Sequence, residues 1–317
     1  MARVTREQVT EYQTIAQRIE NAATDAIRTL LGTVDLTDEK TWPDVIDYIV
    51  RTFGHYGNFS ADLGSQWYQR CRDIETDGKT NYTAAPHFDS NLYGRITNEA
   101  RAILEDVKSG KATPDEVAEK LTASVGNYVA KCNRDSVQEN LNRENEAPAT
   151  SGRRSPTRTE IQAQKGYRST ARRMKERVKF MRVPRADCHC AFCITMASRG
   201  AVYRTRETAG GGDPVNRYHR DCRCSIVPVE GDDPIIDGYG EEVAGYYETY
   251  AEAYDYLGDL WRKSPADYTQ QDADIMARID KAHAAHERHK KENPNLPEWR
   301  PLNEVQIVMR YQNEGMT

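Results

Sequence analysis

Apolar residues recur every three or four positions through most of the first 145 residues. This spacing places them along one face of a helix, while polar residues cover the opposite face. The first such series is long enough to predict one extended helix near the N-terminus. Its members are Val9, Tyr12, Ile15, Ile19, Ala23, Ile27 and Leu30.

More helices are predicted along the same N-terminal part of the chain. Residues 37–39 resemble the N-terminal cap of a second helix that passes through Val45, and the stretch around Trp67 predicts a third. After a loop rich in Gly, Asn and Pro, the periodicity returns near 91–107 and 114–143. We therefore expect an all-helical N-terminal region.

A linker and a strongly basic segment follow these helices. Residues 147–158 (APATSGRRSPTR) lack apolar periodicity, so we place a boundary near residue 150. Residues 151–185 contain twelve Lys and Arg but two acidic residues, a net charge of +10 in a chain whose total is −5. Such a segment either attracts phosphate backbones or forms a solvated helix face paired with the chain's own acidic residues. The candidate nucleic-acid contacts are Arg172, Arg173, Lys175, Arg177 and Lys179.

Residues 230–274 have the opposite charge. They contain thirteen acidic residues but only two basic ones, interleaved with seven tyrosines. Tyr246, Tyr250 and Tyr254 fall at helical spacing. We expect an amphipathic helix here that packs on a partner or on the N-terminal helices.

The overall composition is polar, with 29% charged residues and a mean hydropathy of −0.83. This balance favours several small packed units over one thick core. No run of about eighteen apolar residues occurs, and the N-terminus is charged from the start. We expect a protein that is made in a cytosol, stays soluble and has no membrane partner.

Cysteines are concentrated between Cys188 and Cys224, which contain five of the seven in the chain. In a reducing compartment such a cluster binds metal more often than it forms disulfides. Cys71 and Cys132 instead stand singly in helical patterns, as small buried core residues do. The cluster is therefore the candidate site for chemistry.

The spacing within the cluster is typical of a structural zinc site. Cys190 and Cys193 form a C-x2-C pair, and His219 and Cys222 repeat the same spacing. Zinc favours tetrahedral sulfur and nitrogen ligands, and a complete shell leaves no open position for catalysis. Cys224 competes for the fourth position, because alternate side chains of a strand share one face. The candidate ligands are Cys190, Cys193, His219, Cys222 and Cys224, with Cys188 and His189 as rivals in the first pair.

The residues around the cluster predict a compact fold held by metal. Met196–Gly200 ends a short helix, Ala201–Arg204 forms a strand, and Gly210–Pro214 forms an open loop. Ser225–Val229 is expected to return as the pairing strand. Metal binding would replace a core that is too small to fold alone.

The ordered combination of C-A-F-C, S-R-G-A-V-Y, Y-H, C-R-C and V-P-V between residues 190 and 229 resembles a known family. It is similar to tailed-phage minor head proteins of the Mu F-like class, particularly those of actinobacterial phages, over about residues 160–230. The resemblance implies a low-copy component of the virion head, assembled in the host cytoplasm, that acts with the portal and major capsid proteins. It implies a role in head assembly or DNA delivery without an established enzymatic activity. The chain departs from the pattern at Cys188 and beyond residue 231.

We therefore predict a mainly α fold with a small α+β zinc-knuckle domain. The expected parts are a helical docking region at 1–149, a basic linker and helix at 150–186, the zinc-binding domain at 187–230 and an acidic, tyrosine-rich helical extension at 231–317. A different hypothesis is a zinc-containing nucleic-acid-binding protein or a nuclease of the His-Cys or HNH kind. That reading requires a histidine beside a second metal, whereas His219 is assigned to zinc.

Overall fold

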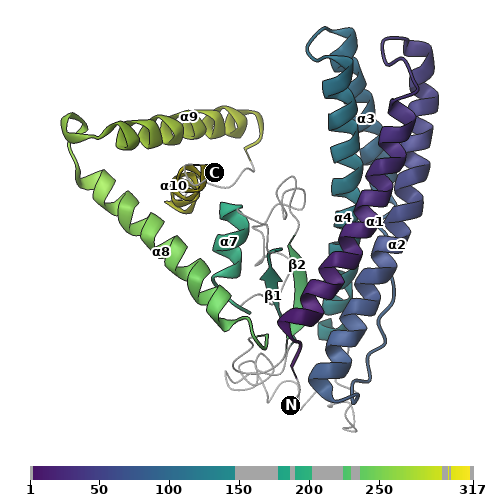
Figure 1. Cartoon of the computed structure of the whole chain (residues 1–317), viewed down its shortest axis with the longest axis horizontal. Helices are drawn as coiled ribbons and strands as arrows, with labels where there is room; N and C mark the ends of the chain where they lie inside the picture. Colours follow the sequence, from purple (N-terminus) through teal and green to yellow (C-terminus); the bar gives the residue numbers. More distant parts are fainter. Residues whose placement is uncertain are drawn as a thin grey trace, which may run out of the picture.

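The computed structural model describes residues 3–146, 178–185, 190–201, 224–229, 236–294, 299 and 301–314. These parts are mainly helical and contain a two-stranded sheet. A bundle of long helices lies on one side of the molecule and a group of C-terminal helices on the other, with the sheet between them (Figure 1). The expected mainly α fold class is confirmed.

The N-terminal bundle consists of four long helices and one short 3-10 helix (Figure 1). The expected second and third helices are a single helix of 35 residues, which no proline or loop interrupts. The α-helix itself begins at Trp42. The expected cap at residues 37–39 instead begins a short 3-10 helix, whose N-cap is Asp38. The elements are α1 (Arg6–Leu31), η1 (Glu39–Thr41), α2 (Trp42–Thr76), α3 (Asn91–Lys108) and α4 (Pro114–Glu146).

Helices α2 and α4 approach closely where glycine and small residues face each other. A Cβ on Gly64 would lie 2.5 Å from the carbonyl oxygen of Asn133 in α4. The Asn133 side chain donates a hydrogen bond of 3.1 Å to the carbonyl oxygen of Ser60. Gly64 is therefore required by packing and not by its backbone angles.

Replacing Gly64 by alanine is expected to lower the free energy of unfolding by about 1–3 kcal/mol, because backbone atoms must move to admit the methyl group. Gly94 in α3 is the matched control, since an added Cβ there has no neighbour within 4 Å. Alanine at this exposed helical position should raise stability by about 0.5–1 kcal/mol. Urea denaturation followed by circular dichroism measures both variants. Equal effects of the two changes would contradict the close packing of α2 on α4.

The sheet pairs β1 (Lys179–Val183) with β2 (Ser225–Val229) in antiparallel order, with Lys179 opposite Val229. The strand expected at residues 225–229 is confirmed. Its partner β1, however, comes from residues that the sequence assigned to the basic linker and helix. The other expected strand, at residues 201–204, lies outside the described residues except for Ala201.

The sheet shares a hydrophobic core with the N-terminal bundle. Trp67 of α2 donates its indole N–H to the carbonyl oxygen of Ile226 at 3.0 Å. The ring of Tyr12 stacks on the ring of Trp67, with 4.4 Å between the ring centres. Gln13 of α1 donates to the carbonyl oxygen of Val183 at 3.1 Å. Cys71 lies buried in this core and Cys132 in the neighbouring bundle core, which confirms them as core residues. The strands are thus buried against helices rather than forming an isolated module.

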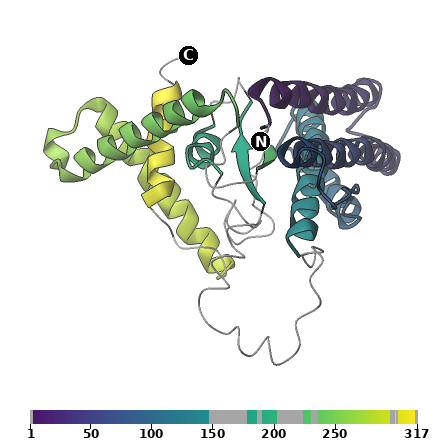
Figure 2. The same ribbon diagram turned by 90° about the horizontal axis from the view of Figure 1, so that it is seen from below.

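The C-terminal helices form a second packed group, in which α10 lies among α7, α8 and α9 (Figures 1 and 2). The amphipathic helix expected in the tyrosine-rich stretch is present as α8, and it packs on α7 and α10. It touches the N-terminal region at its first turn, where Arg6 and Glu242 form an ion pair of 2.8 Å. The elements are α7 (Ala191–Ala197), α8 (Gly240–Arg262), η2 (Pro265–Asp267), α9 (Gln270–Glu292) and α10 (Pro301–Glu314).

Candidate functional site

Three of the five predicted metal ligands lie together. Cys190 is the N-cap residue of α7 and Cys193 lies in the first turn of that helix, so the C-x2-C pair shares one helix end. Cys224 directly precedes β2. Buried Cys193 and Cys224 contact each other, and half-buried Cys190 packs against them. The fold therefore joins the first pair to Cys224 from a distant segment.

The remaining candidates, His219 and Cys222, lie outside the described residues, as do Cys188 and His189. Within the described part of the chain, no three His, Cys, Asp or Glu side chains already have the arrangement of a metal site. The three cysteines are neighbours, but they do not by themselves make a complete metal site.

Cys224 lies beside a small cavity that contains charged groups of both signs. The cavity has a volume of 20 Å³, and side chains of α1 and α4 line it together with Cys224. Its charged residues are Arg134, Arg185 and Glu20. Two guanidinium groups and one carboxylate therefore lie near this thiol.

Helix α7 connects the two packed parts of the molecule through the C-A-F-C motif itself. Phe192 packs against the sheet core, where the buried guanidinium of Arg182 lies 5.1 Å from the centre of its ring. Ala191 and Ile194 instead pack into the core of the C-terminal helices. Helix α7, which carries Cys193 and begins after Cys190, thus lies between the sheet and the C-terminal helices (Figure 1).

The candidate nucleic-acid residues are mostly outside the described residues, which include Lys179 but not Arg172, Arg173, Lys175 or Arg177. Lys179 is the half-buried first residue of β1. Arg182 of β1 has no exposed surface, and its neighbours Met181 and Val183 are also fully buried. At least one basic side chain of this segment is therefore part of the buried core.

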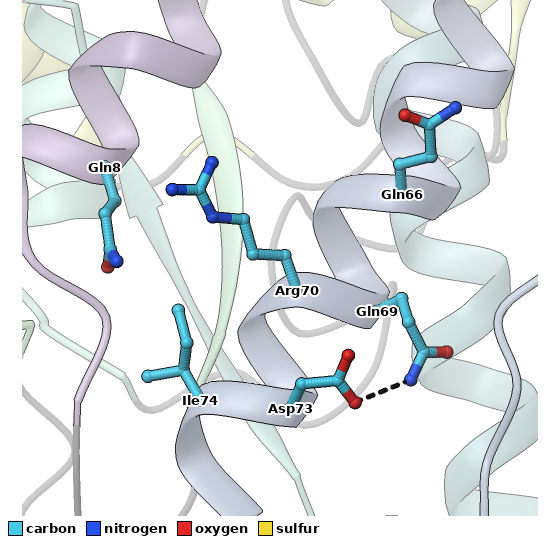
Figure 3. Close-up of a pocket in the computed structure, with 6 residues that line it drawn as sticks. All are labelled: Gln8, Gln66, Gln69, Arg70, Asp73 and Ile74. Carbon is cyan, nitrogen blue, oxygen red and sulfur yellow. Dashed lines mark hydrogen bonds between the residues drawn. The ribbon is translucent and has the colours of Figure 1, made fainter. Parts of the chain in front are cut away.

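An open surface hollow with a volume of 540 Å³ lies between α1 and α2 (Figure 3). Gln69 donates to Asp73 across one turn of α2 at 2.9 Å, and Arg70 forms an ion pair with Glu11 at 3.2 Å. The lining residues include no Ser, Cys or His that would act as a nucleophile or base. They are Gln8, Gln66, Gln69, Arg70, Asp73 and Ile74.

Comparison with known families decides the broader identity. The family model of the VG15 protein matches residues 3–253, which include the helical bundle, the sheet, all seven cysteines and more than half of α8. The chain belongs to the VG15 protein family. This is a phage family, so the chain is a phage protein. The match ends before α9.

No curated protein and no solved structure matches the chain. None of the helices in the described ranges combines the length and apolarity needed to cross a bilayer. The VG15 family match is therefore the comparison on which the function is argued.

Proposed function

We propose that this chain is a minor head protein of a tailed phage, a structural and assembly component near the portal vertex that acts in head morphogenesis or DNA delivery. The observation that carries the proposal is the VG15 family match over residues 3–253. The Mu F-like cysteine motif lies inside that match, and the fold brings Cys190, Cys193 and Cys224 of the motif together. The proposed location is the virion head, after assembly in the host cytoplasm.

The proposed partners are the portal and major capsid proteins, and the proposed role is structural rather than catalytic. The long helices of the N-terminal bundle offer an extended surface for such contacts (Figure 1). The bundle also shares its core with the sheet, whose strand β2 directly follows Cys224.

The proposed role of the cysteine cluster is to bind structural zinc. Cys190, Cys193 and Cys224 would supply three thiolates, and His219 or Cys222 the fourth ligand. Zinc would then hold α7 to the start of β2 and fix the joint between the sheet and the C-terminal helices. Support comes from the contact of the thiols and from the burial of Cys193 and Cys224.

The basic segment at residues 151–185 is proposed to contact packaged DNA. Its net charge of +10 suits a phosphate backbone, and such binding needs no base readout. The composition of purified virions tests the function as a whole. We expect this chain in heads, at a lower copy number than the major capsid protein.

A further inference from the structure

Helix α8 exposes a row of three large aromatic side chains. Tyr247, Tyr254 and Trp261 are 61%, 51% and 50% exposed. They are spaced seven residues apart, and two turns of helix return to nearly the same face, so they line one stripe about 21 Å long. Aromatic groups that only filled a core would be buried, so this stripe is available for contact.

A row of acidic side chains runs along the other edge of the exposed side of α8. At 100° per residue, these carboxylates lie about 100–160° around the helix from Tyr254, on the exposed side. One of them, Asp259, is paired with Arg262. The exposed acids are Glu241, Glu248, Glu252, Asp255 and Asp259.

Packing and stacking contacts hold α8 and its aromatic stripe in position. On the side of α8 away from the acidic row, Ala253, Leu257 and Leu260 are buried in the C-terminal core, about 60–120° around the helix from Tyr254. The ring of Tyr254 stacks on that of Tyr250. Just beyond the helix, Lys263 forms an ion pair of 2.8 Å with Asp272 of α9. This pair, with hydrogen bonds from Tyr256 and the Thr269 backbone, holds the pKa of the Asp272 carboxyl well below its usual range. The face is therefore preformed before any partner arrives.

We propose that this face of α8, made of the aromatic stripe and the acidic row, binds an arginine-rich segment of a partner protein. Guanidinium groups stack on Tyr and Trp rings and also pair with carboxylates, so both rows favour the same ligand. Two copies of the face would bring acidic rows together, and nucleic acid would be repelled by them. The inference goes beyond the proposed function, because it does not depend on the place of the chain in a virion.

Titration calorimetry of the full chain with a synthetic helical peptide tests the proposal. The probe repeats arginine every seven residues, and the comparison peptide has citrulline, which is neutral and of similar shape, at the same positions. We expect the arginine peptide to bind and the citrulline peptide to bind at least about tenfold more weakly. Replacing arginine by lysine should weaken binding to an intermediate degree.

Two sets of variants assign the binding to this face. The triple variant Tyr247→Ala, Tyr254→Ala and Trp261→Ala should weaken binding of the arginine peptide at least about tenfold, with an unchanged circular dichroism spectrum. The charge variant Glu248→Gln, Glu252→Gln and Asp255→Asn should weaken it and reduce its dependence on salt. Phe59→Ala, which removes a similarly exposed aromatic group from α2, is the matched control and should leave binding unchanged.

Three outcomes would overturn the proposal. The first is equal binding of the arginine and citrulline peptides, or binding of neither. The second is a triple aromatic variant that binds as well as the natural chain. The third is binding that appears only after the Lys and Arg residues at 151–177 are changed to Gln, because the occupant would then be the chain's own basic segment and not a partner.

Discussion

Replacing Cys193 by serine should remove zinc from a protein that otherwise binds about one ion per chain. Cys193 is fully buried, contacts Cys224 and lies in the helix that joins the sheet to the C-terminal helices. Serine is a poor zinc ligand, and loss of a structural metal removes its binding free energy from folding. We expect a destabilisation above about 4 kcal/mol, measured by thermal unfolding, together with loss of metal by elemental analysis.

Cys71→Ser is the matched control for this experiment. Cys71 is equally buried but lies in the core shared by the bundle and the sheet, apart from the cysteine cluster. Burial there raises the pKa of its thiol well above the usual range. The control should lose some stability from a buried hydroxyl group and keep its zinc. His219→Ala and Cys222→Ser, compared in the same way, identify the fourth ligand. The zinc proposal fails if the natural protein, purified without chelator, contains no zinc, or if Cys193→Ser retains it.

Changing Arg172, Arg173, Lys175 and Arg177 together to glutamine should weaken DNA binding and flatten its dependence on salt. Each phosphate contact contributes about 0.9 to the slope of log affinity against log salt concentration, so four lost contacts reduce that slope by about three to four. Fluorescence anisotropy with labelled duplexes of two unrelated sequences measures the effect. The natural chain should bind both duplexes equally, because the proposed contacts are to phosphates.

The control for the DNA experiment changes the same number of exposed cations elsewhere. It should retain the salt slope of the natural chain, since net charge alone does not position phosphate contacts. Lys179 is left intact in both variants because it is half-buried in β1. Binding that survives high salt, or equal losses in the two variants, would contradict a DNA contact at 172–177. The control set is Arg101, Lys281, Arg288 and Lys291.

Local periodicity was sufficient to predict most helices but not how they join. The series through Val9 and Ile27 marks a buried face in both sequence and structure, although Ile15 in the same series is 40% exposed. The expected break between Val45 and Trp67 was wrong, because α2 runs without interruption from Trp42 to Thr76. Its close packing on α4 at Gly64 is a contact between residues far apart in the sequence, which local periodicity does not show.

The sheet and the cysteine cluster form through contacts between residues that are far apart in the sequence, and a local sequence pattern does not show such contacts. The sequence assigned the residues of β1 to the basic segment, because Lys179 and Arg182 add to the charge of that segment. In the fold, Arg182 is buried against the ring of Phe192. The sequence proposed Cys190, Cys193 and Cys224 as ligands, and the fold makes these three thiols neighbours. Their binding of a metal stays a prediction. What spacing does not reveal is that α7 packs on two cores at once. The sequence signal for that role was the apolar pair inside the cysteine motif, with Ile194 directly after it.

Quantitative mass spectrometry of purified virions tests the central claim most directly. Particles purified by density gradient and separated into heads and tails would be compared with the major capsid protein as an internal standard. We expect peptides of this chain in the head fraction, at a small fraction of the capsid copy number and enriched with the portal protein when heads are disrupted. Detection of the portal and capsid proteins without any peptide of this chain would contradict its assignment as a minor head protein.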